Sequence, residues 1–334
     1  DRSTAAGSNS VALGNQVTAA GESSAAMGFN TLASGQDSFA MGFHSSATAA
    51  HAFAAGNLAT ASGESSVSMG HNTSASATGA VALGYQNSAT ATGAVALGST
   101  NNATNYNAVA LGSGTVASGD TATAMGKNTV ASGNSSTAMG KNTVASGQNS
   151  FVTGDSCTAE AVDSVAMGHN AYAGSTAYQS VAMGDSVSVN APNSFAMGRY
   201  LSAPTSGSMV FGSGADADHR LGSIYPPGAF SFFMVGFYST TPTLYVDNNN
   251  VGIGTTEPGS KLQIGSNGDG TNGLANAWNT FSSRRWKKNI KPLNNALDKV
   301  SLLRGVSFEW NKSGKHDIGM IAEEVGQVFP ELVA

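Results

Sequence analysis

The strongest constraint on this chain is a glycine that returns every 14 residues. It closes a four-residue phrase, apolar-Ala-large-Gly, as in Val81 to Gly84 and in Val95 to Gly98. A fixed short period means that one small unit is stacked many times and buries its apolar face against its neighbours. With one two-residue insertion after Gly168, this repeat glycine occupies Gly14, Gly28, Gly42, Gly56, Gly70, Gly84, Gly98, Gly112, Gly126, Gly140, Gly154, Gly168, Gly184, Gly198 and Gly212.

The side chains around the repeat glycine predict two short strands in each unit. Val or Phe stands three positions before it in most repeats, Leu or Met one position before it, and usually Ala between them. This i, i+2 spacing predicts a strand whose large residues form a buried face. A second inward candidate is the Ala five positions after the glycine, as at Ala89. Joined by Gly, Ser and Asn turns, these strands predict a parallel β-roll solenoid in which the glycines supply positive φ.

The repeats resemble a known family of surface proteins. Asn9 to Gly28 (NSVALGNQVTAAGESSAAMG) and Asn128 to Gly140 (NTVASGNSSTAMG) are similar to the YadA-like head repeats of trimeric autotransporter adhesins, over residues 1–214. The resemblance implies a left-handed parallel β-roll in each chain and a homotrimer of three rolls. The period alone allows a monomeric solenoid. Burial of the Val and Met stripe against partners nevertheless favours the trimer, because the roll has few large side chains for a core of its own.

Composition excludes several classes of protein. Only 10% of the residues are charged and 7% are aromatic, while 42 are glycine, which is typical of a repetitive structural protein and not of an enzyme core. A net charge of -5 argues against nucleic acid as a partner. A stretch of about 18 apolar residues is absent from the sequence, so we expect no membrane-spanning segment. Lone Cys157 and six scattered histidines predict neither disulfides nor a metal site, and no cofactor is expected.

The methionines and the insertion of the repeat region can each be interpreted from the sequence. Eight methionines directly precede a repeat glycine, and we interpret them as core filler. The insertion, placed within His169 to Tyr178, is expected to bulge as a longer loop. Tyr172 and Tyr178 in this loop are either a binding feature or surface decoration.

Changes of pattern divide the chain into four predicted units. Residues 1–212 hold the fifteen repeats of the β-roll head. Residues 213–250 are crowded with Phe and Tyr and are interpreted as a trimeric neck with a sheet buried on both faces, with sugar stacking as the alternative. Residues 251–280 comprise a segment that resembles a fibre shaft, followed by a Gly and Asn rich linker. Residues 281–334 form the last unit, which contains nine of the fifteen basic residues.

The last unit shows the pattern of a small α+β domain. Apolar spacing from Leu293 to Leu303 predicts a helix that starts near Pro292 and stops at Gly305. Alternation over Val306 to Trp310 predicts a strand, and Ile318 to Ile321 its return. Ala322 to Phe329 is then expected to form a short helix that ends before Pro330.

Two motifs in this unit resemble the intramolecular chaperone of endosialidases and tail spikes, the S74 peptidase family. They are Phe281 to Ile290 (FSSRRWKKNI) and Asp317 to Val325 (DIGMIAEEV). The resemblance implies a domain that drives trimerisation and then cuts itself off, with a serine beside the cut and a lysine five residues later as the base. These catalytic residues are Ser282 and Lys287, and the cut falls between Ser282 and Ser283.

The implied chemistry is reasonable for these residue types. A serine hydroxyl becomes nucleophilic when a base takes its proton, and the neighbouring cations Arg284, Arg285 and Lys288 favour a neutral lysine. The alternative interpretation is a basic, solvated turn before a helix. Ser283 stands where the family usually has an acidic residue. The chain ends 334 - 282 = 52 residues after Ser282, earlier than the family's chaperone. Attack on the preceding peptide and attack from another subunit both remain open.

These patterns together predict a trimeric extracellular fibre that attaches to a surface, on a bacterial cell or on a phage virion. An anchor upstream of Asp1 is expected to distinguish the two. Its partners are further copies of itself and an unidentified host-surface receptor or glycan, and its enzymatic activity is at most the cut in itself. One alternative is a polysaccharide-degrading tail spike. The scarcity of Asp and Glu, which such an enzyme needs as paired carboxylates, argues against it. Another alternative is an ice-binding solenoid. The absence of a Thr that recurs at one fixed repeat position argues against it.

Overall fold

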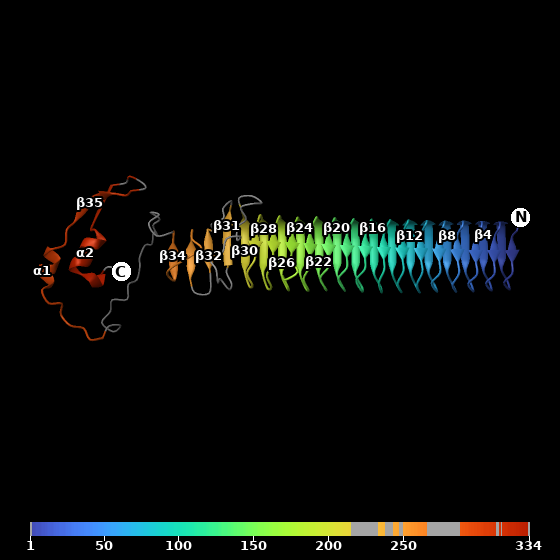
Figure 1. Cartoon of the computed structure of the whole chain (residues 1–334), viewed down its shortest axis with the longest axis horizontal. Helices are drawn as coiled ribbons and strands as arrows, with labels where there is room; N and C mark the ends of the chain where they lie inside the picture. The colour runs from blue at the N-terminus through green and yellow to red at the C-terminus, as the bar shows by residue number, and fades with distance from the viewer. Residues whose placement is uncertain are drawn as a thin grey trace.

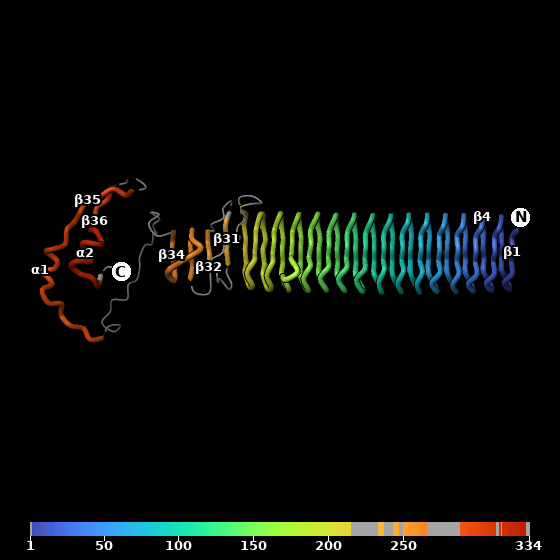
Figure 2. Tube along the Cα trace, viewed as in Figure 1, coloured from blue at the N-terminus to red at the C-terminus, as the bar shows by residue number. Residues whose placement is uncertain are grey.

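The computed structural model shows a rod of stacked strands and a small C-terminal unit (Figure 1). The rod begins at the N-terminus, and its turns follow one another at even spacing along one axis (Figure 2). The structure describes residues 2–214, 233–237, 243–246, 250–265, 288–311, 314 and 316–332.

Each repeat supplies one long and one short strand. The long strands are β2 (Val11–Asn15), β4 (Ala25–Phe29), β6 (Phe39–Phe43), β8 (Phe53–Asn57), β10 (Val67–His71), β12 (Val81–Tyr85), β14 (Val95–Ser99), β16 (Val109–Ser113), β18 (Thr123–Lys127), β20 (Thr137–Lys141), β22 (Phe151–Asp155), β24 (Val165–His169), β26 (Val181–Asp185), β28 (Phe195–Arg199) and β30 (Met209–Ser213). The short strands are β1 (Thr4–Ala5), β3 (Thr18–Ala19), β5 (Leu32–Ala33), β7 (Ser46–Ala47), β9 (Thr60–Ala61), β11 (Ser74–Ala75), β13 (Ser88–Ala89), β15 (Asn102–Ala103), β17 (Val116–Ala117), β19 (Val130–Ala131), β21 (Val144–Ala145), β23 (Thr158–Ala159), β25 (Tyr172–Ala173), β27 (Ser188–Val189) and β29 (Ser202–Ala203).

Strands of each kind pair in parallel with the same strand of the next repeat. Gly84 of β12 lies opposite Gly98 of β14, and Ala89 of β13 lies opposite Ala103 of β15. The short strands form one 15-stranded sheet, and the long strands form a second ladder. The predicted parallel β-solenoid is therefore confirmed.

Small side chains fill the space between the two sheets. Ala82, two positions before a repeat glycine, and Ala89, five positions after it, are fully buried and belong to one core cluster. The expected inward Ala after the glycine is thus confirmed. The expectation that the large residues of the long strand face this core is wrong, because Val81 and Leu83 flank Ala82 and therefore point away from the core.

The repeat glycine has two physical reasons to lack a side chain. Gly126 has a φ of 122°, which favours glycine, as the sequence pattern predicted. A Cβ atom at this position would also lie only 2.0 Å from the carbonyl oxygen of Gly140 in the next turn. The turns therefore approach one another closely along a line of glycines.

The corners of the roll repeat every seven residues. Asn128, Ser135 and Asn142 all have φ near 54°, in the left-handed region where Asn is enriched. The N–H of each such residue bonds to the preceding turn, as in the 2.8 Å bond from Gln86 to the carbonyl of His71. Corner backbone groups are therefore satisfied by stacking.

The insertion affects fewer residues than the expected range His169 to Tyr178. His169 closes β24 and Tyr172–Ala173 forms β25 in the regular places, so the extra residues fall in the turn between Ala173 and Gln179. Tyr178 in this turn is half exposed.

The long-strand ladder continues past Gly212. Strand β31 (Phe233–Phe237) pairs in parallel with β30 and places Gly236 opposite Gly212. Strand β32 (Leu244–Val246) pairs antiparallel with β31 and with β33 (Val251–Ile253), which is followed by β34 (Leu262–Ile264).

The neck sheet is not buried on both faces within one chain. Met234 is buried, whereas the neighbouring Phe233 and Val235 are only partly buried. Phe232 and most of the predicted aromatic neck lie outside the described residues.

The C-terminal unit has the predicted order of elements. Helix α1 (Ala296–Ser301) precedes a hairpin of β35 (Val306–Glu309) and β36 (His316–Gly319), then α2 (Ala322–Val328) and the 3-10 turn η2 (Pro330–Leu332). The first helix begins later than predicted because Asn295 adopts a left-handed conformation, with φ 55°. Among the described residues, none of the helices has the length and apolar character needed to cross a membrane.

We expect Gly126→Ala to destabilise the roll strongly. The new Cβ atom would meet backbone, which has no flexible end that can move aside. The expected loss is roughly 3 kcal/mol per chain, read as a lower melting temperature by circular dichroism. Gly79→Asn is the matched control, since Gly79 has a φ of 65° and an added Cβ would meet nothing within 4 Å. Equal effects of the two substitutions would contradict the close-approach explanation.

Candidate functional site

The residues predicted to cut the chain lie outside the described part of the structure. Ser282, Ser283 and Lys287 all fall within residues 281–287, and the description resumes at an exposed Lys288. Their roles and geometry therefore remain predictions.

The described C-terminal elements bury little of their apolar surface. Neither α1 nor α2 contains a buried residue, and Leu297 and Ile318 are each 81% exposed. An ion pair joins the segment after α1 to α2: Arg304 Nε donates to Glu324 Oε2 at 3.1 Å, and its Nη2 donates to Oε1 at 2.5 Å. The guanidinium lowers the pKa of Glu324, but an ion pair this exposed stabilises only weakly.

An apolar stripe runs along the outer side of the long strands. We define the outer stripe as the residues three and one positions before each repeat glycine in β2 to β30. Val11, Leu13 and Met41 in this stripe are 48%, 57% and 44% exposed. Thr stands in the stripe at Thr123, Thr137 and Thr153, but every turn contributes at least one apolar residue. An apolar surface of this extent is typical of an interaction face.

The interpretation of the stripe methionines as core filler is wrong for the single chain. Met69 is 42% exposed, and each of the eight is exposed or only partly buried. They are Met27, Met41, Met69, Met125, Met139, Met167, Met183 and Met197.

A mixed column of side chains borders the stripe on the same face of the long strands. We define the rim column as the residue directly after each repeat glycine. Its N-terminal half carries stacked rings: Phe29 and Phe43 lie 5.3 Å apart with an interplanar angle of 10°, and His71 and Tyr85 lie 5.1 Å apart. The other members near the N-terminus are mostly Asn and Ser, so the rim is more polar than the stripe.

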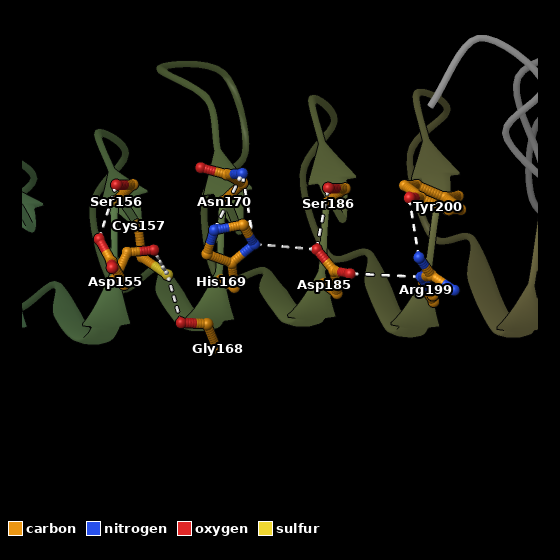
Figure 3. A network of polar contacts seen from close by, with 10 residues as sticks. All are labelled: Asp155, Ser156, Cys157, Gly168, His169, Asn170, Asp185, Ser186, Arg199 and Tyr200. Carbon is orange, nitrogen blue, oxygen red and sulfur yellow. Dashed lines mark hydrogen bonds and ion pairs between the residues drawn. The ribbon is translucent and has the colours of Figure 1, made fainter. Parts of the chain in front are cut away.

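The C-terminal half of the rim column holds a polar ladder (Figure 3). Lys141 Nζ lies 3.1 Å from Asp155 Oδ2, and His169 Nδ1 lies 3.0 Å from Asp185 Oδ1. Arg199 Nε donates to Asp185 Oδ2 at 3.3 Å. The hydrogen bond from His169, supported by the charge of Arg199, lowers the pKa of Asp185. The ladder thus links successive turns through ion pairs and hydrogen bonds between neighbouring polar side chains.

Cys157 is a buried structural residue. It stands three positions after a repeat glycine, is fully buried, and its Sγ donates to the carbonyl of Gly168 at 3.2 Å. Burial raises the pKa of this thiol, which keeps it protonated. The described ranges contain no group of three His, Cys, Asp or Glu side chains that could hold a metal ion.

Two buried asparagines in the same column were missed by the sequence reasoning. Asn87 Nδ2 donates to the carbonyl of Gly98 at 2.7 Å, and Asn87 Oδ1 accepts the backbone N–H of Asn101 at 2.9 Å. Asn101 repeats this pattern toward Gly112 and Thr115. Their signal was a polar residue recurring three positions after the glycine.

Comparison with protein families agrees with this architecture. The family model described as YadA head domain repeat matches overlapping two-repeat segments between residues 1 and 186. The chain belongs to the YadA head repeat family. Beyond residue 186 the head repeat persists in the structure, since β28 and β30 continue the same register.

A second family model covers the C-terminal end of this YadA head protein. The model described as chaperone of endosialidase, of the S74 peptidases, matches residues 282–334. None of the curated proteins matches the chain. The two families together indicate a fibre or adhesin-type protein that is exposed at a surface, and their members are typically trimeric.

We expect Asp185→Asn to lower stability slightly at neutral pH. The lowered pKa of Asp185 means that its contribution is present above the ordinary carboxyl pKa and is lost as the pH falls below about 4. Because the carboxylate is partly exposed, the effect should stay under about 1 kcal/mol and shrink in salt. Thermal melts of both forms at pH 7 and pH 3 test this, with Asp120→Asn as a control without an ion pair among the described residues. If the difference in melting temperature between wild type and Asp185→Asn were the same at pH 3 as at pH 7, the assigned role of the carboxylate would be contradicted.

Proposed function

We propose that this chain forms a homotrimeric extracellular fibre that presents its β-roll for attachment to a surface or host. The observation that carries the proposal is the outer stripe, which is continuous from β2 to β30 and partly exposed in the single chain. Burying it between copies removes apolar area from water, at about 25 cal/mol for each Å².

Three identical rolls can share the outer stripe around one axis. In such an assembly the apolar stripe lies inside and the more polar rim column lies at the edge of each contact, as in an interface with an apolar core and a polar rim. The sheet of short strands, on the other side of the core, stays exposed. Membership in families whose members are typically trimeric supports this arrangement.

We further propose that the C-terminal unit promotes trimerisation and then releases itself between Ser282 and Ser283. The match to the S74 chaperone begins at Ser282, which supports Ser282 as the residue beside the cut and Lys287 as the base. The exposed Leu297 and Ile318 give this unit apolar surface for contacts with other chains. The fibre belongs at a bacterial cell surface or on a phage virion, and its receptor is a host-surface protein or glycan.

Charged residues in the outer stripe should prevent assembly. Leu83 and Leu97 are neighbours in register, and replacing both with Lys places three copies of each charge near the proposed axis. We expect the mass in solution, measured by light scattering after size-exclusion chromatography, to fall from that of a trimer to that of a monomer or to rise through aggregation. Thr90→Lys, at an exposed residue directly after the short strand β13, should leave the trimer intact. A wild-type chain with the mass of one folded subunit would refute the proposal.

Removal of either catalytic group should stop the self-cleavage. Ser282→Ala or Lys287→Ala is expected to slow the cut at least about 100-fold, because nucleophile and base are then missing. A denaturing gel would show the full 33.4 kDa chain in place of the shortened product. Ser260→Ala and Lys261→Ala, both outside the segment that matches the S74 chaperone, serve as controls that should still be cut. Normal cutting of either catalytic variant would exclude the assigned roles.

A further inference from the structure

One face of the roll remains free when the outer stripe is covered. We define the short-strand face as the residues four and six positions after each repeat glycine. It lies opposite the stripe, since the inward alanines of both sheets share one core. At the later position this face carries a hydroxyl in nine successive turns: Ser34, Thr48, Ser62, Ser76, Thr90, Thr104, Ser118, Ser132 and Ser146.

The next three turns depart from this pattern. The same position holds Glu160, Gly174 and Asn190, and the residue two positions before Gly174 is Tyr172. A Cβ atom on Gly174 would lie 3.0 Å from Tyr172 Cε1 and 3.3 Å from its Oη. The ring of Tyr172 therefore lies over Gly174, where any larger side chain would crowd it.

Hydrogen bonds hold the groups around this ring. Tyr172 Oη donates to Glu160 Oε2 at 2.9 Å, which fixes the ring across the turn. Burial and the nearby carboxylate raise the pKa of Tyr172, so the phenol keeps the proton that it donates. Glu160 is itself only partly exposed, so its carboxylate has a defined position beside the ring.

Hydrogen bonds from the insertion and from within the next turn hold Asn190 on the other side of Gly174. Thr176, in the widened turn, donates from Oγ1 to the carbonyl of Asn190 at 2.5 Å. Asn190 Nδ2 donates to Ser188 Oγ at 3.0 Å, and its Oδ1 lies 2.6 Å from the point that a Cβ on Gly174 would occupy. A fixed amide thus lies opposite the carboxylate.

We propose that Tyr172, Glu160 and Asn190 form a binding site for one pyranose ring of a surface glycan. The ring of Tyr172 offers a flat apolar face for the C–H groups of the sugar, and the oxygens of Glu160 and Asn190 accept its hydroxyl hydrogens. Three turns span about 10 Å at the usual strand spacing, which suits a single sugar ring. The site deepens the proposed attachment function and rests on it, and three copies on one trimer would add avidity.

Binding of the intact chain to immobilised glycans tests the site. The probes are N-acetylglucosamine oligomers, galactan, mannan and dextran on a biosensor surface. We expect at least one probe to bind and Tyr172→Ala to weaken that binding at least about tenfold. Glu160→Gln should also weaken it, whereas Tyr172→Phe, which keeps the ring, should retain most of it. Tyr106→Ala, at a tyrosine that is 53% exposed, is the matched control.

Circular dichroism and solution mass of each variant separate loss of the site from loss of the fold. Binding of none of the four probes overturns the proposal, and so does a folded Tyr172→Ala variant that binds as the wild type does. Because all three residues belong to one chain, a monomeric wild type that binds a probe through Tyr172 would refute the trimeric fibre and leave the sugar site standing.

Discussion

The close approach of successive turns is the constraint on which the rest of this structure depends. The positive φ and the missing side chain of each repeat glycine let the backbone of one turn lie against the next, and the parallel ladders then satisfy the backbone groups of strands and corners. Alanines such as Ala82 and Ala89 fit between the sheets, so the core is thin. A thin core leaves little room for the larger apolar residues, and most of them line the outer surface instead.

In this arrangement the role of each side chain depends on its position in the repeat. Inward positions hold the roll together. Those two positions before and five positions after the repeat glycine are mostly Ala, whereas the position three after it ranges from Ala59 to Leu201. The outer stripe is the surface that we propose is buried between copies of the chain. The rim column beside it changes from rings at Phe29 and Phe43 to the charges of Asp185 and Arg199. The later position of the short-strand face carries a hydroxyl in nine successive turns, and Glu160 and Tyr172 then give this face a different character near the insertion.

Much of the fold was predictable because the period fixes it. The glycine spacing correctly predicted the parallel strands, and the Ala after each glycine correctly predicted part of the core. The alternation over Val306 to Trp310 correctly predicted the first strand of the hairpin. The outward orientation of the stripe was not predicted, because alternation along a strand does not show which of its two faces is turned toward the core. A sheet at the neck was expected, but the parallel pairing of β31 with β30 was not. Phe233 to Gly236 repeats the apolar-x-apolar-Gly phrase, yet it follows 24 residues after Gly212 and so falls outside the 14-residue period. The grouping of Glu160 with Tyr172 depends on stacking between turns, which periodicity alone did not reveal.

The identical register of neighbouring turns has a consequence for how such a fibre can evolve. Gly84 opposite Gly98 and Gly98 opposite Gly112 make equivalent contacts, so duplication or deletion of one whole 14-residue unit leaves every remaining junction unchanged. Each event would lengthen or shorten the rod by about 4.8 Å. Genetic recombination between repeats can therefore adjust the length of the rod in steps of one repeat.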